Sequence, residues 1–139
     1  MVGIDFKNIS VLLIEDDALM SEFINLILHD LNIGKVVTAQ NGQEALVKLR
    51  LREIEPDVIL CDLEMPVMDG FEFLATIRGE QGLDTSDTPV LVLTGHKDEE
   101  STRKAIKLGI HGYLAKPVKQ EDILKRITHA LTSPMIQSS

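Results

Sequence analysis

The chain has 139 residues, enough for one domain to bury a core without disulfide bonds or metals. Its apolar fraction of 44% and charged fraction of 26% are typical of folded globular proteins and argue against disorder. Its 22 acidic residues outnumber its 14 basic ones, and the net charge of -8 makes binding to a nucleic acid backbone unfavourable.

The first half of the chain alternates short apolar runs with segments of helical spacing. A run at 11–14 predicts a strand, and it precedes one helical face made of Met20, Ile24, Ile27, Leu28 and Leu31. A second strand is predicted at 35–39 and a third at 58–61. Each is followed by the spacing of a helix N-cap and its third-position acid, at Asn41 with Glu44 and at Asp69 with Glu72.

The second half continues the alternation. Residues 79–89 are mostly polar and hold two glycines, so they predict a loop. Strands follow at 90–93 and 113–115, with weaker helical spacing between them at Thr102, Ala105, Ile106 and Gly109. The last helical face consists of Ile123, Leu124, Ile127 and Leu131.

Five strand–helix units in succession predict an α/β fold with a parallel sheet covered by helices on both faces. The strands are continuously apolar rather than alternating, which agrees with burial on both sides. No linker or composition shift divides the chain. We therefore expect a single domain over 1–139 with its core at about 10–131.

Polar residues follow four of the predicted strands: Glu15 and Asp16, Asp62, Thr94, and Lys116. Ligands of open α/β sheets bind beyond the carboxyl ends of the strands, so these groups should meet at one edge. Clustered carboxylates repel one another and need a cation, which Lys116 and a hard divalent ion such as Mg²⁺ would supply. Such a set suits a transferring phosphoryl group, with Asp62 as the central candidate for a carboxylate nucleophile.

The stretch 61–70, Cys-Asp-Leu-Glu-Met-Pro-Val-Met-Asp-Gly, resembles the receiver domains of response regulators, whose type member is the bacterial chemotaxis response regulator. The resemblance extends from 11 to 131. It implies the doubly wound, flavodoxin-like (βα)5 fold with strand order 2-1-3-4-5. It also implies two-component signalling, in which the phosphodonor is a phosphohistidine on a sensor histidine kinase or phosphotransfer protein.

The same resemblance implies a role for each acidic residue. Asp62 would be the phosphoacceptor. Asp16 would bind Mg²⁺ directly and Glu15 through water, while Glu64 would offer its backbone carbonyl. Asp17 would be an extra acid at a variable position.

The remaining implied residues belong to the switch. Thr94 would contact the phosphoryl group and Lys116 would pair with one of its oxygens. Tyr113 would turn inward on activation. A cis peptide bond is implied between Lys116 and Pro117.

The implied output is a phosphorylation-dependent contact with a downstream protein, rather than turnover of a substrate. Its expected face lies on the fourth helix, fifth strand and fifth helix and includes Lys104, Lys107, Tyr113 and Lys119. The domain would be a monomer or weak dimer. Because no apolar run could span a membrane and Cys61 has no partner for a disulfide, we expect a cytoplasmic protein without membrane contact.

Two alternatives stay open at this point. The chain could be the receiver part of a longer regulator with an output domain. It could also be an aspartyl-phosphate phosphatase of the haloacid-dehalogenase type, although such enzymes place a second Asp two residues after the nucleophile, where this chain has Glu64.

Overall fold

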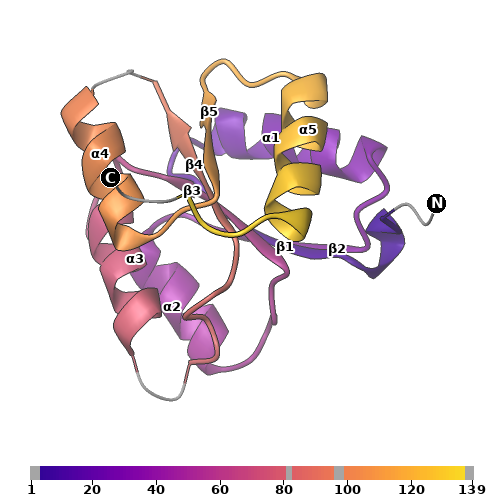
Figure 1. Ribbon diagram of the computed structural model, residues 1–139. Coiled ribbons are helices and arrows are strands. Elements are labelled where there is room, and N and C mark those ends of the chain that lie inside the picture. The colour runs from indigo at the N-terminus through magenta and orange to yellow at the C-terminus, as the bar shows by residue number, and fades with distance from the viewer. Residues whose placement is uncertain (1–3, 81–82, 96–98, 137–139) are drawn as a thin grey trace.

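A computed structural model describes residues 4–80, 83–95 and 99–136 (Figure 1). In this part of the chain the strands form one parallel sheet of order β2-β1-β3-β4-β5, as the resemblance implied. The strands are β1 Ser10–Ile14, β2 Lys35–Ala39, β3 Val58–Asp62, β4 Val90–Thr94 and β5 Gly112–Ala115. The predicted strands therefore match the observed ones to within a residue at either end.

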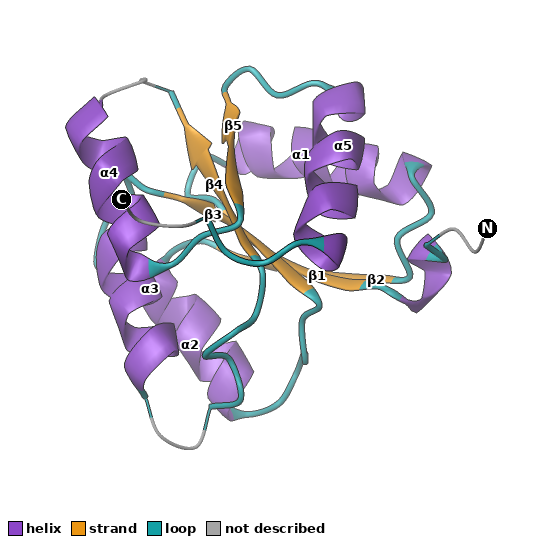
Figure 2. Ribbon diagram, in the orientation of Figure 1, coloured by secondary structure: helices purple, strands orange, loops and turns teal. Residues whose placement is uncertain are grey.

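Helices cover both faces of the sheet (Figure 2). They are α1 Ala18–Asp30, α2 Gly42–Arg50, α3 Gly70–Gly79, α4 Glu99–Leu108 and α5 Gln120–Thr132, preceded by a short 3-10 turn, η1 Phe6–Asn8. Helices α2, α3 and α4 lie on one face, and α1 and α5 on the other. The doubly wound α/β fold is thus confirmed. Among the described residues no helix is long and apolar enough to cross a membrane.

The core lies on both sides of the central strands. On β1, Leu12 and Ile14 face the α2–α3–α4 side, and Val11 and Leu13 face the α1–α5 side; all four are fully buried. Strand β3 is buried throughout. This two-sided burial explains the continuous apolar runs in the sequence. It also fixes the strand ends, and therefore the side chains that follow them.

Three polar side chains cap the N-termini of helices. Asn41 accepts a hydrogen bond from the Glu44 amide at 2.9 Å, and Asp69 accepts one from the Glu72 amide at 2.9 Å, which confirms both predicted caps. Asp17 caps α1 by accepting from the amides of Leu19 and Met20. Asp17 therefore has a local role, which is to cap the start of α1.

The helices differ from the predicted ones in three places. Leu124 is 37% exposed, and Ala130 takes the inward position on α5 because the 3.6-residue period carries Leu124 off the buried stripe. Gly109 lies beyond α4 with a φ of 105°, a conformation that ends the helix. Gly79 belongs to the last turn of α3 instead of the loop that follows it.

Candidate functional site

The carboxyl ends of four strands bring the candidate residues to one edge of the sheet. Glu15 follows β1, Asp62 ends β3, Thr94 ends β4, and Lys116 follows β5. Parallel pairing sets how far along the strands these residues lie, since Asp62 is opposite Leu93 on β4 and Thr94 is opposite Ala115 on β5. Residues separated by up to 101 positions in the chain thus share one site.

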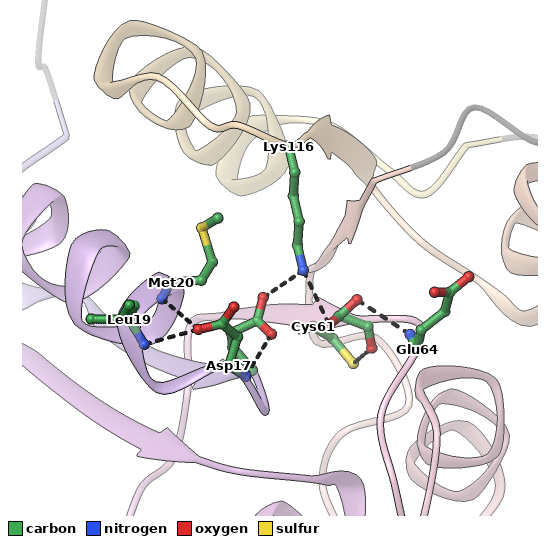
Figure 3. A network of polar contacts seen from close by, with 8 residues as sticks. Asp17, Leu19, Met20, Cys61, Glu64 and Lys116 are labelled. Carbon is green, nitrogen blue, oxygen red and sulfur yellow. Dashed lines mark hydrogen bonds and ion pairs between the residues drawn. The ribbon is translucent and has the colours of Figure 1, made fainter.

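Lys116 bridges the two buried carboxylates. Its Nζ lies 2.6 Å from Glu15 Oε1 and 3.1 Å from Asp62 Oδ2. Figure 3 shows Lys116 reaching from the end of β5 into this network. The side chain of Glu15 is completely buried and that of Asp62 is 8% exposed, whereas Lys116 keeps 20% of its side chain exposed. One cation therefore serves two carboxylates in a largely dehydrated place.

The charges of this network are incompletely balanced. Burial raises the pKa of Glu15 to about 7, although the contact with Lys116 and the hydrogen bond from the Asp17 amide both lower it. Burial alone would lower the pKa of Lys116, but its contacts with Glu15 and Asp62 outweigh burial and hold that pKa above its ordinary value. A further cation at this edge would therefore be electrostatically favourable.

Backbone amides orient both carboxylates. The Asp17 amide donates to Glu15 Oε2 at 3.1 Å, and the Glu64 amide donates to Asp62 Oδ1 at 3.2 Å. In each case the donor lies two residues after the acid, in the loop that leaves the strand (Figure 3). The loops thus fix which oxygen of each carboxylate accepts a backbone hydrogen bond and which side of the carboxylate stays open to a ligand.

The acidic cluster has the composition of a site for a hard divalent cation. Glu15, Asp16 and Asp62 each place one carboxylate oxygen within 4.8 Å of the others. Asp16 is exposed, so an ion could approach from solvent, whereas the other two are buried. Carboxylate oxygens are the protein ligands that Mg²⁺ prefers. Together with the raised pKa of Glu15, this donor set fits Mg²⁺.

A cavity of about 380 Å³ opens beside this cluster. Its lining brings together Asp62, Thr94 and Lys116, the candidates that should act on one group. Glu64 also borders it. Phe71 of α3 and Ser101 of α4 also line the cavity, and neither could be predicted from the sequence because their position depends on how the helices pack.

The expected switch and output residues are distributed around β5 and α4. Tyr113 is half-buried on β5 and packs against the core of the α2–α3–α4 face. Lys107 and Lys119 are exposed. Lys104 is exposed too, and its ammonium lies 4.4 Å from the centre of the Phe71 ring, so it connects α4 to α3. The Lys116–Pro117 bond is cis, as the resemblance implied.

The fold and this edge define a doubly wound α/β protein with an acidic, lysine-containing site at the carboxyl ends of its strands. The family model for the response regulator receiver domain matches residues 11–128, so the chain belongs to the response regulator receiver family and is a receiver domain of two-component signalling.

Individual relatives agree with this assignment. The chain is 39% identical, over 92% of its length, to protein-glutamate methylesterase/protein-glutamine glutaminase 1 of Syntrophomonas wolfei, of which it covers 39%. Chemotaxis response regulator CheY4 of Vibrio cholerae is 33% identical, with a TM-score of 0.78 over 88% of this chain and 98% of that one. The receiver domain of sensor histidine kinase PA1611 from Pseudomonas aeruginosa, solved with a magnesium ion in its active site cleft, is 25% identical, with a TM-score of 0.78 over 90% of this chain and 98% of that one.

The curated relatives are longer than this chain. It spans half or less of the length of the first four of them, between 8% and 50%. What they share with it is the receiver domain, and the methylesterase activity named for two of these relatives belongs to those longer proteins. The family match does not favour the phosphatase alternative.

Proposed function

We propose that Asp62 accepts a phosphoryl group from a phosphohistidine on a sensor histidine kinase or phosphotransfer protein, with Mg²⁺ as cofactor. The observation that carries this proposal is the Asp62 carboxylate itself. It lies 3.1 Å from the Lys116 ammonium in a cavity that Thr94 also lines. A carboxylate beside a cation and a hydroxyl at an open cavity suits phosphoryl transfer.

In the proposed reaction an oxygen of Asp62 attacks phosphorus and forms an acyl phosphate. The phosphorus–nitrogen bond to the donor imidazole breaks, and the imidazole leaves with the bonding electron pair. The Glu64 amide holds Asp62 Oδ1 in place throughout. Lys116 exchanges its contact with Glu15 for one with a phosphoryl oxygen, which its long side chain and 20% exposure permit.

Mg²⁺ would be held by Glu15, Asp16, Asp62 and the backbone carbonyl of Glu64, and it would neutralise charge on the transferring phosphoryl group. The acidic cluster supports this assignment, as does the magnesium ion in the active site cleft of the PA1611 receiver domain. Once Mg²⁺ is bound, Glu15 no longer needs the Lys116 contact to offset its charge.

Phosphorylation would act through Thr94 and Tyr113. The new group adds about two negative charges and three acceptor oxygens at Asp62, which ends β3 beside β4. Thr94 ends that strand and lines the cavity, so its hydroxyl can turn to a phosphoryl oxygen. A shift of Thr94 at the end of β4 changes the space beside half-buried Tyr113 and biases a two-state surface. Thr94→Ala should accept phosphoryl but respond weakly to it.

The partners should occupy different surfaces. The donor must cover the residues that border Asp62, and α1 starts next to Glu15 and Asp16. Leu19, Phe23 and Leu26 of α1 are 79%, 48% and 57% exposed at helical spacing, so they offer the donor an apolar contact. The downstream protein would bind the α4–β5–α5 face at Lys104, Lys107, Tyr113 and Lys119. We further propose a single receiver domain, monomeric or weakly dimeric, that acts in the cytoplasm and turns over no other substrate.

Intact mass after incubation with Mg²⁺ and a small acyl phosphate tests the acceptor. Wild type should gain one phosphoryl group, and the gain should disappear without Mg²⁺ and in Asp62→Asn. An equal gain in Asp62→Asn would place the phosphoryl group elsewhere and overturn the assignment.

A further inference from the structure

The loop between β3 and α3 contains a strained turn close to the site. The Met68 amide donates to the Pro66 carbonyl at 2.8 Å, and Val67 between them has a φ of 69°. A hydrogen bond across one residue with positive φ makes this a γ-turn of the rare, strained kind. Valine is poorly suited to that conformation because its branched Cβ crowds the backbone.

The Val67 side chain does not offset this strain by packing. Its side chain is 80% exposed, so packing does not hold the turn from its centre. Strained backbone persists where the surrounding structure fixes it, and such places concentrate at functional sites. The contacts that hold the turn must therefore come from its neighbours.

Met68 provides one tie, to the start of α2. The Gly42 amide donates to the Met68 carbonyl at 3.2 Å. A Cβ atom on Gly42 would come within 2.9 Å of Met68 Cγ and 3.0 Å of Phe73 Cβ, so glycine leaves the room that Met68 fills. The half-buried Met68 side chain also packs against the core of this face.

Gly70 provides the second tie, to the acceptor strand. Its amide donates to the Leu63 carbonyl at 3.0 Å, which closes the loop on itself. A Cβ atom on Gly70 would lie 2.4 Å from the Asp62 carbonyl oxygen. The start of α3 therefore rests on the backbone of Asp62, and Glu64 lies between the two ties.

We propose that Met68, seated against Gly42, is a positioning residue that holds the strained Val67 turn and through it the Glu64 backbone at Asp62. This inference rests on the proposed function, because Glu64 matters there as an amide donor and a carbonyl ligand. Without the Met68 side chain in this position, the backbone hydrogen bond to Gly42 alone does not hold the loop against the strain at Val67. Removing the strain should then make the tie dispensable.

The test compares Met68→Ala, Val67→Asn and the double variant, since asparagine tolerates positive φ. Mg²⁺ titration followed by the NMR amide signals gives the affinity, and the Glu64 signal reports its hydrogen bond before Mg²⁺ is added. Met68→Ala should bind Mg²⁺ about 10-fold more weakly, the low end for losing a group that orients a metal ligand. The double variant should return to within about 2-fold of wild type. Val67→Asn alone should bind at least as tightly as wild type.

Met135→Ala is the matched control, because Met135 is also half-buried but lies beside Gly109, away from this loop. It should leave the Glu64 signal and the Mg²⁺ affinity as in wild type. A Met68→Ala protein that only melts earlier, with both readouts unchanged, would overturn the inference, as would a double variant as weak as the single one. If wild type binds no Mg²⁺, the proposed function fails, and the Glu64 signal alone then decides about the turn.

Discussion

The two ends of the sheet handle buried charge in opposite ways. At the carboxyl ends, the buried acids Glu15 and Asp62 share the ammonium group of Lys116 beside an open cavity. At the other end, the guanidinium of Arg78 on α3 meets backbone instead of acids. It donates to the Gly109 carbonyl at 2.7 and 3.1 Å and to the Thr85 carbonyl at 2.8 Å.

The carboxyl end is therefore a site that can exchange ligands, whereas the Arg78 contacts at the other end form a fixed structural joint. Burial lowers the pKa of Arg78 to about 10, yet the group stays charged at neutral pH and ties α3 to the loop before β4 and to the end of α4. His111 lies at this end too, and burial together with the Arg78 charge lowers its pKa, so it stays neutral. The carboxyl end instead holds Glu15 with a pKa of about 7, an imbalance that a metal ion would correct.

The largest expected effect comes from removing the cation at the carboxyl end. Lys116→Met should slow phosphorylation by an acyl phosphate by about 100-fold or more, the usual loss when a group that stabilises developing charge is removed. Quantifying phosphoprotein against time by intact mass measures it. Lys119→Met is the matched control, because Lys119 is exposed on the same loop. Equal rates for Lys116→Met and the control would contradict the role of Lys116.

A smaller effect, on stability, is expected at the opposite end. Arg78→Met keeps most of the side-chain bulk but leaves partly buried carbonyl groups without their donor, so the free energy of unfolding should fall by about 2 kcal/mol. Urea unfolding measures this loss. Phosphorylation of the folded variant should stay within about 2-fold of wild type, an effect below about 0.5 kcal/mol. A large loss of phosphorylation without a loss of stability would show that the two ends are not separate.

A further expected effect is a pH dependence at Glu15. Its folded pKa of about 7 exceeds its ordinary value of 4.5, so between these values the folded state binds more protons than the unfolded state. Without Mg²⁺, stability from this group is therefore complete below pH 4.5 and declines as the pH rises through 7. Mg²⁺ affinity should rise across the same window, because the ion requires the carboxylate.

Urea unfolding of wild type and Glu15→Gln between pH 4.5 and 8 isolates this contribution. Glutamine keeps the shape of the protonated acid but does not titrate. The difference in stability between the two proteins should therefore change with pH in the stated direction, and a constant difference would show that Glu15 titrates near its ordinary pKa.

Local features of the fold could be predicted from the sequence. The caps at Asn41 and Asp69 depend on a side chain and an amide three residues away, so their spacing is visible directly. The strands were visible because burial on both faces leaves continuous apolar runs. The meeting of Glu15, Asp62 and Lys116 followed from the rule that parallel strands end at one edge.

Features that depend on packing between distant elements could not be predicted. The shared contact of Lys116 with both acids, the Arg78 joint and the Lys104–Phe71 contact arise only when the helices are seated. The strained turn at Val67 is also unpredictable, because valine disfavours it and the tie to Gly42 comes from another strand–helix unit. The particular roles of the site residues remain predictions that the measurements above address.

Beryllofluoride, which mimics a phosphoryl group on a carboxylate, gives the most direct test of Asp62 as the acceptor. With Mg²⁺ present, it should produce saturable changes in the NMR amide signals of Thr94 and Tyr113 in wild type. The same titration of Asp62→Ala, or of wild type without Mg²⁺, should leave those signals in place. Identical changes in Asp62→Ala, or none in wild type, would contradict the proposal that Asp62 accepts the phosphoryl group and switches this surface.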